Sequence, residues 1–239
     1  MISNTSRRAG SVAGSTGILG VPGVAWVVAV AFVLAGAVLA PVASASSGSG
    51  FPAWRDLPAV PPVQPYTVAS VWTGSELLVA GRAATPDGVG YNVAAAYRPA
   101  TDTWRTLPAP PPFTGTHPGQ VQAVWTGREM LLWGAAIQAA YDPVTNHWRR
   151  LTALPPGPGQ IGPGGHVMVW TGRQMIIWGG CCGGTEAGGA AYDPATDSWR
   201  RLPPAPLAAR YAVGAWTGRE LVLAGGRDVG GTVFSDAAA

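Results

Sequence analysis

A repeat of about 46 residues runs through most of the sequence after residue 50 and constrains the fold more than any other feature. The triplet Trp-Thr-Gly begins at four positions, with spacings of 53, 45 and 46 residues: Trp72, Trp125, Trp170 and Trp216. A second tryptophan, followed by arginine, also occurs four times, at Trp54, Trp104, Trp148 and Trp199. A period in the forties is typical of architectures in which each copy is one supersecondary unit.

Each copy predicts four short strands, as the stretch from Gly164 to Leu202 illustrates. The first strand is an apolar segment that ends in Trp170-Thr, and a Gly-x pair of the kind that closes hairpins follows it. The second is an apolar run that ends in Gly179, and the third ends in the turn signal Tyr192-Asp-Pro. The fourth begins at Trp199-Arg. Because glycine and proline interrupt every long apolar run, helices are disfavoured, and the pattern predicts an all-β fold of propeller blades.

The order of apolar run, Gly-Gly, Tyr-Asp-Pro and then a tryptophan, with six residues between the tyrosine and the tryptophan, resembles the kelch repeat. The Trp-Thr-Gly variant is similar to kelch arrays of exported bacterial proteins, whose blades are related to the central domain of galactose oxidase. The resemblance covers about residues 51–236 and implies a kelch-type β-propeller without implying a single activity. Galactose oxidase needs copper held by tyrosines and histidines, with a cysteine cross-linked to a tyrosine. No positions here reproduce that set, so we expect no copper and no other cofactor.

Kelch propellers usually have more blades than the four for which this sequence has material. The fourth copy passes Gly225-Gly226 and reaches Ser235–Ala239 without a Tyr-Asp-Pro or a Trp-Arg segment. A Trp-Arg segment without its first three strands stands before the first copy, at Trp54–Leu57. Either this N-terminal strand completes the last blade and closes four four-stranded blades into a ring, which would remove exposed sheet edges, or the sequence is part of a longer array. We expect the ring-like arrangement.

The N-terminal segment predicts export. Residues 1–17 carry Arg7 and Arg8 without an acidic residue, residues 18–40 are uncharged, and small residues follow at Ala43 and Ala45. This order is that of a secretory signal peptide over residues 1–45, cleaved after Ala45. The alternative is an uncleaved signal anchor, because an apolar helix over residues 18–40 is long enough to cross a bilayer. The repeats lie outside the cell in both cases.

A flexible linker over residues 46–50 precedes the repeat region, which occupies residues 51–239. Charged residues make up 11% of the chain, against about 25% in an ordinary globular domain. The sequence contains no lysine, and its net charge of +3 includes Arg7 and Arg8. Scattered arginines do not make the basic patch that nucleic-acid binding needs. We therefore expect no nucleic-acid partner, and a membrane contact only through residues 18–40 if the signal stays uncleaved.

Chain direction alternates through a blade, so the loops divide between two faces. The Thr-Gly and Asp-Pro turns lie on one face and are nearly identical among copies. The connectors between blades and the loops between second and third strands lie on the other face, which we call the variable face, and they differ in every copy. Variable loops on a rigid scaffold are where binding sites usually lie. The candidate binding residues are Arg82, Asp87, Tyr91, His117, Glu186, Arg210, Tyr211, Arg227 and Asp228.

The only cysteines, Cys181 and Cys182, are neighbours on the variable face. Two cysteines of an exported protein usually pair, and adjacent ones can do so only as a strained vicinal disulfide. Two free thiols and a soft-metal pair are the alternatives, although no histidine lies near them in sequence. His166 opens a first strand and is placed to face the central channel. No phosphate-cradling loop, Ser-His-Asp signature or metal-ligand spacing occurs, so we assign no catalytic residue and no metal site.

These observations favour an exported, non-catalytic kelch propeller that binds a protein or a glycan through its variable face. One alternative is a carbohydrate-active or galactose-oxidase-like enzyme remnant, with acids such as Asp87, Glu186 or Asp228 around the axis. The other is a truncated, inactive paralogue.

Overall fold

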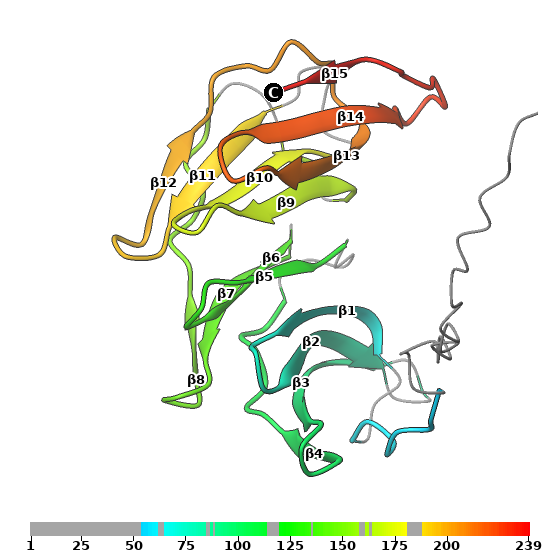
Figure 1. The fold of residues 1–239 in the computed structure, drawn as a ribbon, viewed down its shortest axis with the longest axis vertical. Helices are drawn as coiled ribbons and strands as arrows, with labels where there is room; N and C mark the ends of the chain where they lie inside the picture. The colour runs from blue at the N-terminus through cyan, green and yellow to red at the C-terminus, as the bar shows by residue number, and fades with distance from the viewer. Residues whose placement is uncertain are drawn as a thin grey trace, which may run out of the picture. The chain divides into compact units, whose positions relative to one another are not determined.

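The computed structural model describes residues 54–61, 65–84, 87, 89–113, 120–134, 136–157, 161–162, 164–180 and 188–239. The regular structure in these residues is β-strand, in four antiparallel sheets (Figure 1). The chain divides into two units, Met1–Ala53 and Trp54–Ala239, and the sheets belong to the second. The signal or anchor of residues 1–45 and the linker of residues 46–50 lie outside the described part. No helix within that part is long and apolar enough to cross a membrane.

The four sheets, called blades 1 to 4 in chain order, each consist of strands that are consecutive in sequence. Blade 1 contains β1 (Pro65–Trp72), β2 (Leu77–Ala84), β3 (Gly90–Arg98) and β4 (Thr103–Thr106). Blade 2 contains β5 (Gln122–Trp125), β6 (Met130–Gly134), β7 (Ile137–Asp142) and β8 (His147–Arg150). Blade 3 contains β9 (His166–Trp170), β10 (Met175–Gly179), β11 (Gly189–Asp193) and β12 (Ser198–Arg201). Blade 4 contains β13 (Tyr211–Trp216), β14 (Leu221–Arg227) and β15 (Ala237–Ala238).

The Trp-Thr-Gly motif closes the first hairpin of every blade. In blade 1 the Thr73 N–H donates to the Glu76 carbonyl at 3.0 Å, and the Thr73 hydroxyl accepts the Glu76 N–H at 2.9 Å. Gly74 has a φ of 101°, in the left-handed region that glycine adopts without strain. The same pair of bonds closes the other three hairpins, at Thr126, Thr171 and Thr217. The sequence prediction of a two-residue hairpin is confirmed in all four copies.

The Tyr-x-Pro segment joins the third and fourth strands through a second recurring device. The Tyr97 hydroxyl donates to the Asp102 carboxylate at 2.5 Å, and the Tyr97 and Trp104 ring centroids lie 5.1 Å apart. Asp102 has a φ of 53°, a conformation in which Asp and Asn are enriched. Blades 2 and 3 repeat the hydroxyl bond, from Tyr141 to Asn146 and from Tyr192 to Asp197. The repeated residues therefore belong to the scaffold, as the sequence indicates.

Neighbouring blades pack face to face through apolar side chains. Along β6, Met130 and Leu132 are buried against blade 1, whereas Leu131 and Trp133 are buried against blade 3. This alternation follows from the two-residue period of a strand, which points successive side chains to opposite faces. A third cluster joins blades 3 and 4. Among the described residues, no such cluster joins blade 4 to blade 1.

The expected pairing of Trp54–Leu57 with the last blade is not formed. These residues are not in a strand, and the fourth sheet has three strands that end with β15. The Arg55 guanidinium donates instead to Tyr97 and Asp102 of blade 1, at 2.9 Å each, and these bonds hold the segment there. The described fold therefore consists of three four-stranded blades and one three-stranded blade.

Candidate functional site

A polar pocket of about 520 Å³ opens where the first strands of blades 2, 3 and 4 begin. Its volume falls in the range of roughly 300–1,000 Å³ that is typical of small-molecule sites. The connectors and the loops between second and third strands meet at these strand ends, so the polar pocket belongs to the variable face. It is lined by Gln120, Gln122, Gly165, His166, Tyr211, Ala212 and Arg227.

His166 is a buried polar residue in this lining. It is 2% exposed, and its ring meets that of Trp133 edge-on, with 4.5 Å between the centroids. Burial lowers the pKa of His166 to about 4, so its imidazole is neutral at pH 7. Neither ring nitrogen has a hydrogen-bond partner among the residues that the structure describes. Both ring nitrogens are also shielded from solvent. Because buried polar groups normally have partners, this unsatisfied donor and acceptor distinguish His166 within the lining.

Packing alone does not call for a histidine at this position. His166 lies four residues before the tryptophan of its Trp-Thr-Gly motif, where the other copies have Val68, Val121 and Ala212. Val121 is 6% exposed and belongs to the apolar cluster between blades 1 and 2. An aliphatic side chain thus fills the equivalent place at another junction. The imidazole adds hydrogen-bonding capacity that the scaffold does not use.

Two glutamines from blade 2 hold the start of β9. The Gln122 side-chain amide donates to the His166 carbonyl at 2.7 Å, and the Gly165 N–H donates to the side-chain oxygen of Gln120 at 2.7 Å. Each interaction uses one end of a side-chain amide that has both a donor end and an acceptor end. The glutamines therefore orient His166 and still add polar atoms to the lining of the polar pocket.

Blade 4 contributes an aromatic ring and a positive charge. A Cβ atom at Gly165 would lie 1.7 Å from Cδ1 of Tyr211, so only glycine lets this ring approach β9. Arg227 stands opposite Tyr211 in the register of β13 and β14. None of the ion pairs between described residues involves Arg227. As far as the structure describes it, the pocket lining therefore contains one guanidinium and no carboxylate.

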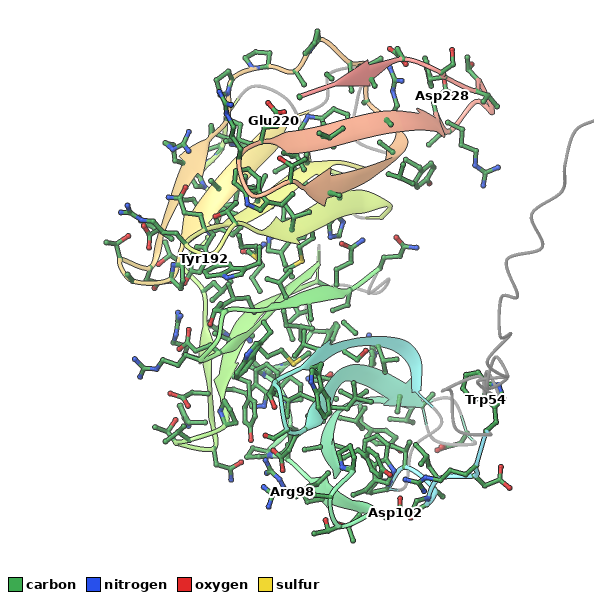
Figure 2. All side chains as sticks on the ribbon, viewed as in Figure 1. Trp54, Arg98, Asp102, Tyr192, Glu220 and Asp228 are labelled. Carbon is green, nitrogen blue, oxygen red and sulfur yellow. The ribbon has the colours of Figure 1, made fainter. Side chains whose placement is uncertain are left out.

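Two other candidates of blade 4 are engaged within the scaffold. Arg210 is 2% exposed; its guanidinium pairs with Asp236 and lies 3.7 Å from the ring centroid of Phe234. Asp228, in the loop after β14 (Figure 2), accepts the N–H of Thr232 at 2.8 Å. This backbone bond is the main cause that lowers the pKa of Asp228. Both residues stabilise the C-terminal part of blade 4.

The remaining candidates lie in blade 1 or outside the described residues. Arg82 stands opposite Asn92 in the register of β2 and β3, and Asp87 is exposed in the hairpin between these strands. Tyr91 lines a separate apolar groove on blade 1, described below. His117, Glu186 and the pair Cys181-Cys182 fall outside the described residues. Of the seven candidates that the structure describes, Tyr211 and Arg227 are the two that line the polar pocket.

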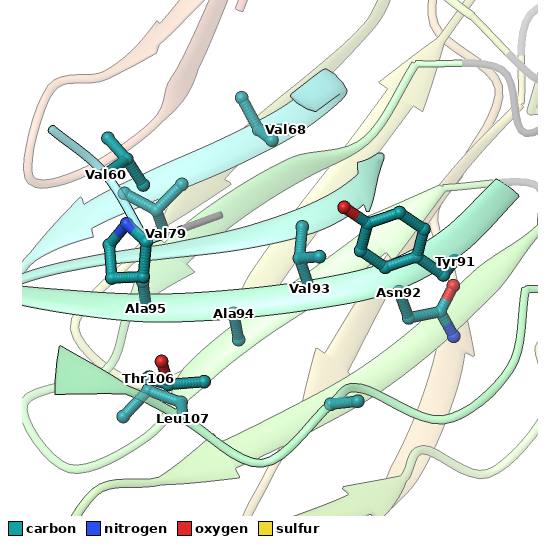
Figure 3. A pocket seen from close by; sticks show the side chains of 12 residues that line it. Val60, Val68, Val79, Tyr91, Asn92, Val93, Ala94, Ala95, Thr106 and Leu107 are labelled. Atoms are coloured by element: carbon teal, nitrogen blue, oxygen red, sulfur yellow. The ribbon is translucent and has the colours of Figure 1, made fainter. Parts of the chain in front are cut away.

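A groove of about 240 Å³ lies on the face of blade 1 that points away from blade 2 (Figure 3). Four valines surround it in Figure 3: Val60, Val68, Val79 and Val93. Tyr91, Thr106 and Leu107 complete its lining together with small apolar residues. We call it the blade 1 groove. Its apolar lining distinguishes it from the polar pocket.

The sequence did not single out Gln120 and Gln122. A signal exists, because Gln122 occupies a first-strand position that is Ala69, Val167 or Val213 in the other copies. Within the described residues, no group of three or more His, Cys, Asp or Glu side chains is arranged to hold a metal ion.

Neither a scan against protein-family models nor a search of curated proteins finds a match. Among solved structures, the chain is similar to the structure of YjhT, a kelch-like β-propeller protein, with a TM-score of 0.55 and 16% sequence identity. The fold is a kelch-like β-propeller. The match covers 73% of this chain and 63% of YjhT, so the propeller described here spans less than two thirds of that protein. At this identity the likeness concerns the fold alone.

Proposed function

We propose that this protein is an exported, non-catalytic kelch-type propeller that binds a glycan in the polar pocket. The observation that carries the proposal is the buried His166 imidazole, which has no partner among the described residues and lines a pocket built by three blades. A ligand that supplies the missing hydrogen bonds removes the cost of leaving this group unsatisfied, which is about 1–3 kcal/mol. The pocket thus gains most from a ligand rich in hydrogen-bonding groups.

The chemistry of the lining favours hydroxyl groups as those ligand atoms. A sugar hydroxyl is both a donor and an acceptor, which matches a neutral imidazole and the two glutamine amides. The Arg227 guanidinium and the Tyr211 hydroxyl add further donors. The Tyr211 ring provides an apolar face beside these polar groups, and binding sites generally combine the two. A glycan fits this set better than an extended protein surface, because the polar groups converge in one concave site.

The charges of the same lining support binding without hydrolysis. Glycoside hydrolases generally place two carboxylates on either side of the bond to be broken. The described residues that line the polar pocket include no Asp or Glu. Asp228, one of the acids that an enzyme would use, has its carboxylate in its own loop. This favours the binding protein over a carbohydrate-active enzyme remnant.

Replacing Arg227 with alanine is expected to weaken glycan binding at least tenfold, since hydrogen bonds to charged groups contribute about 1.5–3 kcal/mol. The measurement is a screen of a glycan panel, followed by calorimetric titration of the glycan that binds. Arg219→Ala is the matched control, because Arg219 is an exposed arginine in the Thr-Gly turn at the other end of the same strand pair. A panel without a binder, or equal affinities for the two variants, would contradict the proposal.

Export is proposed from the N-terminal charge order, and the exported bacterial type of kelch array from the Trp-Thr-Gly motif. We expect the mature chain to begin at Ser46 when the protein is produced in a bacterial host. N-terminal sequencing of the exported protein checks this. An intact N-terminus in the membrane fraction would instead establish the uncleaved anchor, and a chain kept in the cytoplasm would overturn export.

A further inference from the structure

Blades 2 and 3 meet through a recurring set of polar contacts. Arg149, which follows the fourth-strand tryptophan of blade 2, donates to the Tyr192 hydroxyl of blade 3 at 3.0 Å. The Trp199 indole N–H of blade 3 donates back to the Thr152 carbonyl at 2.7 Å. The same indole bond joins blades 1 and 2, from Trp148 to the Pro108 carbonyl at 2.8 Å. These contacts fix each fourth strand against the next blade.

The segment before blade 1 makes the same contacts as these fourth strands. Arg55 donates to the Tyr97 hydroxyl and to Asp102, and the Trp104 indole N–H donates to the Pro58 carbonyl at 2.9 Å. Arg55 and Pro58 are the repeat equivalents of Arg149 and Thr152. Residues 55–58 therefore lie on blade 1 as the fourth strand of a preceding blade would lie.

The residues that line the blade 1 groove resemble those that pack between two blades elsewhere in the chain. Four of its lining residues are the repeat equivalents of four residues of blade 2 that are at most 6% exposed and packed against blade 1. The lining residues are Val68, Val79, Val93 and Ala95, and their equivalents in blade 2 are Val121, Leu132, Ile137 and Ala139. The groove therefore fits the apolar face of another blade.

Blade 4 presents an apolar face of the required kind. Val213 is 71% exposed, whereas its equivalent in blade 3, Val167, is 7% exposed and packs against blade 4. Ala215 is exposed on the same face. At a junction between blades, the next blade would pack against this face.

Charge adds a second complementarity between the two ends. Glu76 and Glu129 immediately precede the second strands of blades 1 and 2, and each binds the fourth-strand arginine of its own blade at 2.8 Å. Glu220 is their equivalent in blade 4 (Figure 2); it is exposed and has no ion pair among the described residues. Arg55 is the equivalent of those arginines and has bonds to blade 1 but none to such a glutamate. Among the described residues, Arg55 lacks such a glutamate and Glu220 lacks such an arginine, so each can be the missing partner of the other.

We propose that the blade 1 groove receives blade 4 of a second copy of this chain, with Arg55 of one copy paired to Glu220 of the other. In the three complete blades the leucine that directly follows the fourth strand donates its N–H to the third strand: Leu107 to Ala94, Leu151 to Gln138 and Leu202 to Gly189. By the same register, Leu57 would donate to Ala237 of the second copy, adding a fourth strand beside β15. Two such junctions related by a two-fold axis close a ring of eight blades, within the usual range of roughly four to eight.

The fold favours a second copy over blade 4 of the same chain. Residues 55–58 are already bound to blade 1 in the manner of an internal junction, yet blades 1 and 4 share no apolar cluster among the described residues. The match to YjhT covers only 63% of that chain, as expected when these blades follow part of a larger propeller. This inference is independent of the glycan proposal.

Cysteine cross-linking distinguishes the two arrangements. Leu57→Cys and Ala237→Cys are introduced in separate chains that also carry Cys181→Ser and Cys182→Ser. Residues 57 and 237 would stand directly opposite each other on adjacent strands, which is close enough for a disulfide. Mixing and oxidising the two chains is expected to give a disulfide-linked dimer, while neither chain alone gives one. The absence of a dimer from the mixture would overturn the proposal. So would an internal cross-link, without dimer, in a single chain that carries both cysteines.

The oligomeric state gives a second readout that does not depend on introduced thiols. We expect the unmodified propeller to sediment as a dimer and Glu220→Arg to weaken the dimer at least tenfold. Because Glu220 is exposed and has no ion pair in the described chain, this substitution should leave the melting temperature of the monomer unchanged. A propeller that stays monomeric at every concentration tested would contradict the second copy.

Discussion

Replacing Leu132 with alanine is expected to lower the free energy of unfolding by about 2–5 kcal/mol. Leu132 is fully buried and lies in the apolar cluster that joins blades 1 and 2. Its truncation removes buried apolar surface and leaves a cavity, because the strands of two paired sheets cannot move together to fill it. Denaturant unfolding of the wild-type and variant chains measures the difference.

Leu57→Ala is the matched control for this substitution, since it removes the same atoms from a residue that is 47% exposed. We expect a loss well below that of Leu132→Ala when both are measured at a concentration where the chain is monomeric. Equal losses at the two positions would mean that the face between blades 1 and 2 is not a packed junction.

The free energy of unfolding is expected to fall by about 3 kcal/mol between pH 6.5 and pH 4, and His166→Val is expected to remove this fall. Burial lowers the pKa of His166 to about 4 in the folded chain, whereas an unfolded histidine has a pKa of about 6.5. Between these values the unfolded chain binds a proton that the folded chain does not, so stability decreases as the pH falls. Each unit of difference contributes about 1.36 kcal/mol.

Carboxylates change the free energy of unfolding at a lower pH than His166 does, so their contribution can be separated from that of His166. The hydrogen bond from Arg105 lowers the pKa of Glu76, and those from Tyr97 and Arg55 lower the pKa of Asp102. Such groups stabilise the fold above their unfolded pKa, near 4, and lose that contribution as the pH falls further. The control is His147→Val, because His147 is exposed on β8. An unchanged slope between pH 6.5 and 4.5 in His166→Val would contradict the assignment.

The features predicted correctly from the sequence are those set by local interactions. The Thr73 hydroxyl bonds the backbone three residues away, and Tyr97 bonds Asp102 five residues away. These bonds recur with the motif, so the strands and turns follow from each copy by itself. The prediction of an all-β fold with four sheets therefore rests mainly on these local interactions.

Features that depend on packing between blades were not evident from the sequence. The segment Trp54–Leu57 resembles a fourth strand in sequence. Its position is determined by hydrogen bonds from Arg55 to Tyr97 and Asp102 of blade 1, which lie 42 and 47 residues further along the chain. The polar pocket likewise assembles from three blades. Tyr211 and Arg227 were predicted from the variable loops, whereas Gln120 and Gln122 acquire a role only when β5 lies beside β9.

The claim that a glycan occupies the polar pocket is tested most directly by NMR of the histidine rings during titration with the glycan that the panel identifies. The imidazole of His166 is expected to gain hydrogen bonds from the ligand, so its ring signals should shift with saturation. The ring signals of exposed His147 should stay in place. Saturable glycan binding that leaves the His166 signals unchanged would contradict the proposed site.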